Sequence, residues 1–167
     1  MSKSCKKNFQ LLPGFPGVPG LPGVSIPTMI PFSSGSSFDD TILPNASIGF
    51  GSINPNIGSF PSISFTSSLF GNITHLNIAV ATYDISGPDI TLIFTVATSP
   101  PGSNIYTASS LTGTVFIPNG SSPAVYTIDV SGSVPILVGS GIALLVSSGA
   151  LGMEAPRITI SGSILIT

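Results

Sequence analysis

A run of Pro-Gly triplets near the start of the chain constrains its structure more than any other feature. Glycine stands at every third position of this run, and proline precedes each glycine. The period is typical of three polyproline-like chains wound around one another, because only glycine fits at the crowded axis of a triple helix. A run this short cannot hold three chains together, so it predicts that the remaining sequence supplies the trimer contacts. The glycines are Gly14, Gly17, Gly20 and Gly23.

The composition excludes a disordered chain and favours one that associates. Charged residues make up 6% of the sequence, against roughly 25% in an average soluble protein. Disorder requires low hydrophobicity and high charge, whereas 42% of these residues are hydrophobic. A surface built from Ser, Thr and Asn with little net charge repels other copies only weakly, which favours association.

The few charges are unevenly distributed along the chain. Three of the four basic residues, Lys3, Lys6 and Lys7, lie at the N-terminus, and one base, Arg157, stands among six acids in the rest. The basic tail could attract the acidic body of another subunit, or it could be a solvated tail. The body has no basic patch, so nucleic acid is excluded as a partner.

The chain divides into three parts by composition. Residues 1–12 form a tail with an apolar tip, residues 13–31 form a stiff Pro/Gly connector, and residues 32–167 form the body. The body is predicted to be all-β, because helix breakers recur every few residues and several segments alternate between polar and apolar positions. The alternating segments are 73–83, 90–98, 125–130 and 157–167, and shorter strands are expected at 47–50, 62–66, 113–117, 136–138 and 142–146.

The alternation also predicts which side chains face the core. In segment 73–83, Leu76, Ile78 and Val80 share one face, while Ile73 and His75 fall on the other. In the other long segments, the residues that share one face are Ile90, Leu92, Phe94 and Val96; Ile158, Ile160, Ile164 and Ile166; and Tyr126, Ile128 and Val130, opposite Val125, Thr127 and Asp129. Eight or nine short strands separated by turn residues predict a β-sandwich or jelly roll.

The faces of the strands bear on how copies of this chain meet, and the end of the last segment bears on the fold of one copy. Several strands are uncharged on both faces, yet a sandwich core buries only one face of each sheet. A homotrimer would cover the second face, in agreement with the triplet run. The last alternating segment continues to Thr167, which predicts that the C-terminal residue is tied into a sheet.

Segment 134–151 is apolar enough to suggest a membrane span, but Pro135 and two Gly/Ser clusters interrupt it. We expect two buried strands joined by a tight turn, and no membrane span. An apolar signal-peptide core does not follow the N-terminal lysines, so no secretion signal is expected.

Residues suited to catalysis are scarce, and we expect no enzyme activity, cofactor or metal site. His75 is the one histidine, and a metal site would need further His or Cys ligands. Ser140 lies between two glycines and is interpreted as a turn residue. Cys5 is the one cysteine, so it either links two chains or remains a free thiol.

The Pro-Gly triplets, the following Ile30-Pro31-Phe32-Ser33-Ser34-Gly35 motif and the later Ile48-Gly49-Phe50-Gly51 motif resemble the collagen-like exosporium glycoproteins of Bacillus-type spores. That resemblance covers residues 13–167 and implies a C-terminal head similar to tumour necrosis factor, which forms homotrimers. The collagen-like run here is much shorter than in the stalked members. The chain looks closer to the small subunits that stack into spore appendage fibres.

This resemblance implies a structural role at the spore surface, in the exosporium or an appendage, with assembly from the mother-cell cytoplasm. N-terminal peptides of one trimer would dock into the head of the next, with Phe9, Leu11 and Leu12 as anchors. The implied partners are other copies of the chain, an exosporium anchor protein and a collagen-like tip protein. An alternative function is a trimeric adhesin head that recognises carbohydrate or a host surface.

Overall fold

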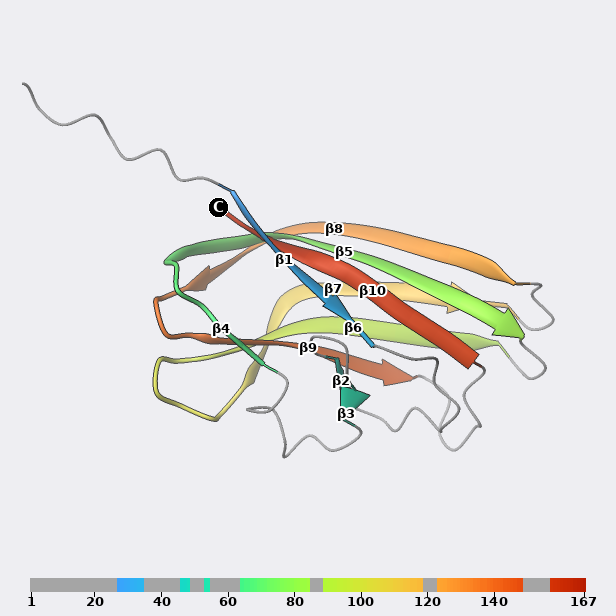
Figure 1. The fold of residues 1–167 in the computed structure, drawn as a ribbon, viewed down its shortest axis with the longest axis horizontal. Coiled ribbons are helices and arrows are strands. Elements are labelled where there is room, and N and C mark those ends of the chain that lie inside the picture. Colours follow the sequence, from blue (N-terminus) through green and yellow to red (C-terminus); the bar gives the residue numbers. More distant parts are fainter. Residues whose placement is uncertain are drawn as a thin grey trace, which may run out of the picture.

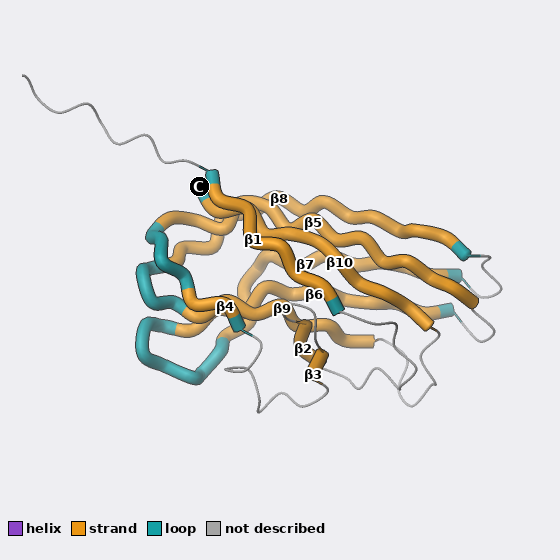
Figure 2. The backbone as a smooth tube through the Cα atoms, viewed as in Figure 1, coloured by secondary structure: helices purple, strands orange, loops and turns teal. Residues whose placement is uncertain are grey.

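The computed structural model describes residues 27–34, 46–48, 53–54, 64–84, 89–118, 123–148 and 157–167. These residues form ten strands and no helix (Figure 2). The strands are β1 (Thr28–Ser33), β2 (Ala46–Ile48), β3 (Ile53–Asn54), β4 (Phe65–Thr66), β5 (Gly71–Asp84), β6 (Ile90–Ser99), β7 (Thr107–Ile117), β8 (Ala124–Ile136), β9 (Gly141–Ser148) and β10 (Arg157–Ile166).

The strands form two antiparallel sheets that face one another (Figure 1). Sheet A has the order β1-β10-β5-β8, and sheet B has the order β3-β2-β9-β6-β7, with β4 added beside β9. If the two-residue strands β3 and β4 are set aside, the other eight fall into sheets of order 1-8-3-6 and 2-7-4-5. This is the strand order of a jelly roll, two Greek keys folded into a double sheet. The predicted all-β jelly-roll sandwich is therefore confirmed, while trimer formation remains a prediction.

The head begins earlier in the chain than the composition suggested. Strand β1 starts at Thr28 and pairs with β10 through Ser33, so residues 28–31, which were assigned to the connector, lie in sheet A. Pro31 stands on this edge strand, where a missing amide proton is tolerated. Its neighbour Phe32 is buried opposite Gly162 of β10. Because residue 162 of β10 is a glycine, there is space for the Phe32 ring against β10. Phe32 thereby anchors the first strand.

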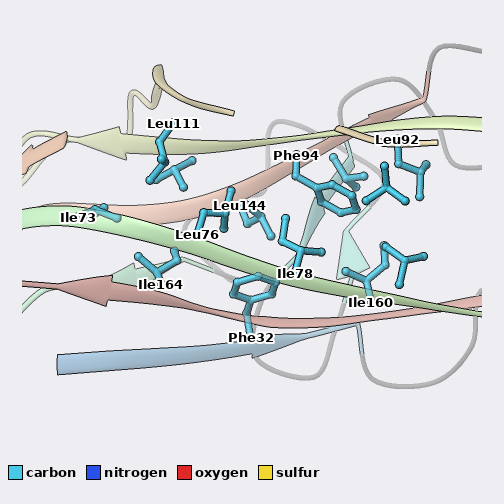
Figure 3. Packing of buried hydrophobic residues seen from close by; sticks show 14 of the residues in the cluster. Phe32, Ile73, Leu76, Ile78, Leu92, Phe94, Leu111, Leu144, Ile160 and Ile164 are labelled. Carbon is cyan, nitrogen blue, oxygen red and sulfur yellow. The ribbon is translucent and has the colours of Figure 1, made fainter. Parts of the chain in front are cut away.

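The core lies between the sheets and consists of aliphatic side chains around Phe94 (Figure 3). The inward sets expected for β6 and β10 are all buried, and Tyr126, Ile128 and Val130 of β8 pack against the core. Glycine is also required within this interface. A Cβ on Gly113 of β7 would overlap the end of Ile128 and lie 2.9 Å from Val130 Cγ2. The sheets can thus approach closely because sheet B carries no side chain at this point.

Strict alternation placed one residue of β5 on the wrong face. Ile73 is fully buried, together with Leu76, Ile78 and Val80, instead of facing outward with His75. Against β10, strand β5 has one extra residue, Thr74, because Leu165 pairs with His75 and the next residue, Ile166, pairs with Ile73. The extra residue of such a β-bulge turns the preceding side chain to the other face.

The apolar segment 134–151 contains a turn, as expected, but not a hairpin. Strand β8 ends at Ile136, and residues 137–140 form the turn, so the strand predicted at 136–138 was wrong. The strands on either side, β8 and β9, belong to different sheets. Gly139 has a φ of 85°, a left-handed conformation that suits glycine and lets the chain cross between the sheets.

The C-terminal residue is held in the structure, as predicted. The backbone of Thr167 exchanges two hydrogen bonds with Asn72, with N–O distances of 2.8 and 2.9 Å. A side chain on the adjacent Gly71 would meet the carbonyl oxygen of Thr167 at 2.5 Å. The start of β5, the end of β10 and the start of β1 therefore lie at the same end of the sandwich (Figure 1).

Candidate assembly surfaces

The residues considered for chemistry do not gather at one place. His75 is exposed on β5, with Nδ1 3.2 Å from Oγ1 of its neighbour Thr74. Ser140 is buried in the turn before β9, and its Oγ accepts a hydrogen bond from the Leu137 amide at 3.0 Å. In the part of the chain that the structure describes, no three His, Cys, Asp or Glu side chains are grouped as metal ligands. The same part contains no helix long and apolar enough to cross a bilayer.

The outer face of sheet A is nearly free of charge, and one of its cross-strand rows consists of small side chains only. The register aligns Ser33, Ser161, Ala79 and Thr127 in one cross-strand row. The neighbouring rows are Pro31, Ser163, Asn77 and Asp129; Met29, Leu165, His75 and Ser131; and Thr159, Ala81 and Val125. In these four rows Asp129 is the one carboxylate, and it lies on the edge strand β8. The centre of the face can therefore approach another protein surface without burying a charge.

The outer face of sheet B carries no charge at its described positions. Thr91, Ile93 and Thr95 of β6 are half-buried, and Thr112, Thr114 and Phe116 of β7 are exposed beside them. A hydrogen bond of 3.2 Å joins the hydroxyls of Thr95 and Thr112. This face therefore combines threonine hydroxyls with the exposed ring of Phe116.

A third surface lies at the end of the sandwich where three turns meet, at the left of Figure 1. We call it the apolar end and define it by Leu69, Phe70, Ile105, Leu137 and Val138. The exposed fractions are 79% for Phe70, 77% for Ile105, 63% for Leu137 and 58% for Val138. The three turns, residues 64–70, 100–106 and 137–140, contain no charged residue.

Backbone hydrogen bonds join two of these turns, and the third lies against them. The Gly139 amide donates to the Ser67 carbonyl at 2.7 Å, and the Ser67 amide donates to the Ser140 carbonyl at 2.8 Å. On its other side, the turn approaches the second loop so closely that a Cβ on Gly139 would lie 3.2 Å from Cβ of Pro101. The apolar end is therefore built by the fold from three segments that are distant in the sequence.

Sequence reasoning missed the apolar end because its residues come from three separate turns. One signal was available: large hydrophobic residues stand directly beside turn residues, as in Ser67-Ser68-Leu69-Phe70 and Leu137-Val138-Gly139. Hydrophobic residues that cannot continue a strand at such positions are left exposed. The segment 137–138 had instead been assigned to a strand.

The residues predicted to join copies of the chain lie outside the described part of the structure. These residues are the anchors Phe9, Leu11 and Leu12, the connector glycines Gly14, Gly17, Gly20 and Gly23, and Cys5. Their roles remain predictions.

Comparisons with known proteins give structural similarities only. No protein-family model matches the chain, and no curated protein matches it. Among solved structures, the chain is similar to Eiger TNF from S. frugiperda, with 9% identity and a TM-score of 0.35 over 80% of this chain and 91% of that one. It is also similar to the turnip yellow mosaic virus structure, with 14% identity and a TM-score of 0.31 over 86% of this chain and 94% of that one. A third similarity is to desmodium yellow mottle tymovirus, with 15% identity and a TM-score of 0.29 over 90% and 93% of the two chains.

Proposed function

We propose that this protein is a structural subunit of a spore-surface fibre, in which trimeric jelly-roll heads stack through their N-terminal peptides. The observation that carries the proposal is the outer face of sheet A. The spore setting comes from the resemblance of the Pro-Gly run and its flanking motifs to collagen-like exosporium proteins.

The outer face of sheet A has the size and chemistry of a protein interface. Four strands spaced about 4.8 Å apart and roughly 30 Å long present an area on the order of 600 Å². A standard interface buries about 800 Å² per partner, so modest contributions from the strand edges would complete it. Short side chains such as Ser161 and Ala79 lose little conformational entropy when they are covered. This face therefore favours contact with further copies of the chain.

The Pro-Gly run favours three copies rather than two. A triple-helical run needs three chains side by side, and β1, which follows the run in the sequence, starts at one end of each head. Three tails leaving one end would act together on a neighbouring trimer. Linked contacts of this kind bind far more tightly than a single tail, because the second and third contacts form at high effective concentration. A head-to-tail contact that does not close on itself produces a filament.

Negative-stain electron microscopy of the full-length protein tests the proposal. We expect filaments from the full chain and separate trimers after deletion of residues 1–12. A triple substitution, Phe9→Ser, Leu11→Ser and Leu12→Ser, should have the same effect, whereas Asn8→Ala with Gln10→Ala in the same tail should leave filaments intact. If the deleted protein forms the same filaments, the tail does not connect the heads.

A further inference from the structure

The Pro-Gly run carries a second pattern besides its glycines. Its remaining positions are apolar, and they also recur every third residue: Phe15, Val18, Leu21 and Val24. A polyproline II helix has three residues per turn and rises about 3.1 Å per residue, so in that conformation these four side chains would fall on one face and form a stripe about 28 Å long. The run therefore has an apolar face of its own, which is left in water unless another surface covers it.

The described chain starts beside a surface that can cover this stripe. Thr28 pairs with Ile166, the last residue of β10, and the following residue, Thr167, exchanges backbone hydrogen bonds with Asn72, two residues after Phe70. Counting strand spacings of about 4.8 Å and rises of about 3.3 Å places the start of β1 within roughly 20 Å of the three turns. The apolar end and the exit of the N-terminal segment thus share one end of the head.

We propose that the Pro-Gly run of each copy lies across the apolar end of the same copy, with the stripe Phe15, Val18, Leu21 and Val24 on Leu69, Phe70, Ile105, Leu137 and Val138. The connection is short enough, since Val24 stands three residues before Pro27, a span of about 10 Å. A segment tethered this closely has an effective concentration in the millimolar range. Contact within one copy therefore outcompetes contact with a separate copy at ordinary protein concentrations.

The chemistry of both surfaces suits this contact. Polyproline II segments bind to apolar, aromatic-lined surfaces because their conformation is already formed and loses little entropy on binding. Phe70 supplies an aromatic ring, and Pro101 adds an apolar wall beside Gly139. The three turns contain no charged residue, so covering them does not remove a charged group from water.

The proposal goes beyond the fibre function and does not depend on it. With residues 13–24 held on the head, residues 1–12 begin at this end of the molecule and remain free to contact a neighbour. The connector would then be an ordered part of the head rather than a loose tether.

Paramagnetic relaxation in the full-length protein tests this contact. A Cys5→Ser, Pro19→Cys variant carries one nitroxide on the run, away from the apolar stripe, and its Ile, Leu and Val methyl groups are isotopically enriched. We expect the methyl signals of Leu69, Ile105, Leu137 and Val138 to lose most of their intensity, while the signal of Val125 at the far end of β8 persists. Further substitution with Phe15→Ser and Leu21→Ser should restore the signals, whereas the matched change Ser25→Ala should not.

A mixed sample distinguishes contact within one copy from contact between copies. In that sample the nitroxide is on unenriched chains, and the enriched chains carry only Cys5→Ser. Signal loss in the mixed sample would assign the contact to another copy and overturn the proposal, as would persistence of the apolar-end signals in the first sample. Microscopy of the same variants reports filaments separately, so this contact and the fibre function can fail independently.

Discussion

The substitution Gly162→Ala tests the packing of the first strand on the last. Phe32 of β1 faces Gly162 of β10, and a Cβ at this position would lie 2.6 Å from Phe32 Cζ and overlap the carbonyl oxygen of Asn77. The phenyl ring can shift, but the carbonyl belongs to the paired strand β5 and can move only if the strands separate. Overpacking of this kind costs about 1–3 kcal/mol.

The same substitution also has a stabilising effect, which is smaller than the steric cost. Alanine restricts the unfolded chain more than glycine and on that account stabilises a compatible site by about 0.4–1 kcal/mol. The steric cost exceeds this gain, so Gly162→Ala should lower the free energy of unfolding by about 1–2 kcal/mol. With a typical urea dependence of about 1–3 kcal/mol per molar, the unfolding midpoint should fall by roughly 1 M.

The assay is equilibrium urea unfolding of all variants at one protein concentration, because association makes apparent stability depend on concentration. Ser163→Ala, on the outer face of the same strand, is the matched control and should change stability by less than about 0.5 kcal/mol. Replacing Phe32 with Leu in the Gly162→Ala background should recover part of the loss, since the two residues are in contact. A Gly162→Ala protein as stable as the wild type would refute the packing of β1 described here.

Three further substitutions test other parts of the molecule. Thr82→Val removes two hydrogen bonds between β5 and β8, of 3.1 and 3.2 Å, and should lower the free energy of unfolding in urea by about 1–3 kcal/mol. The control Thr127→Val, at an exposed position, should change it little. Equal effects of the two substitutions would contradict the role of the buried hydroxyl. Phe94→Ala should lower the free energy of unfolding by about 3–5 kcal/mol because its ring is fully buried, and a loss below 1 kcal/mol in thermal unfolding would place the ring outside the core. In the protein lacking residues 1–12, Ala79→Arg on the outer face of sheet A should dissociate the trimer in light scattering, whereas Thr114→Arg on sheet B should not. An unchanged mass for the first variant would exclude that face as the interface.

The local structure of the long strands could be predicted from sequence because alternation is a local property. The inward sets of β6 and β10 were read correctly, since Leu92 and Ile160 and their alternate neighbours follow the period of two without interruption. Ile73 was misplaced because the extra residue Thr74 disrupts the period of two in β5, and a bulge leaves no clear trace in the sequence. Residues 28–31 of β1 were assigned to the connector because they follow the Pro/Gly-rich run, although an edge strand accepts Pro31.

The arrangement of the strands could not be predicted in the same way. Thr28 pairs with Ile166, at the other end of the chain, and the sequence of neither segment indicates which strand it pairs with. The apolar end depends on the same long-range topology, because Phe70, Ile105 and Leu137 meet only after the two sheets have formed. The pattern of single strands therefore predicted the jelly-roll class, while the surfaces proposed for assembly required the folded head.

The mass of the full-length protein in solution tests the self-assembly account most directly. Sedimentation velocity at micromolar concentration should show no stable single chain of 16.9 kDa. The smallest abundant particle should have three times that mass, with filaments sedimenting ahead of it. A homogeneous 16.9 kDa particle that persists as the concentration is raised would contradict the account.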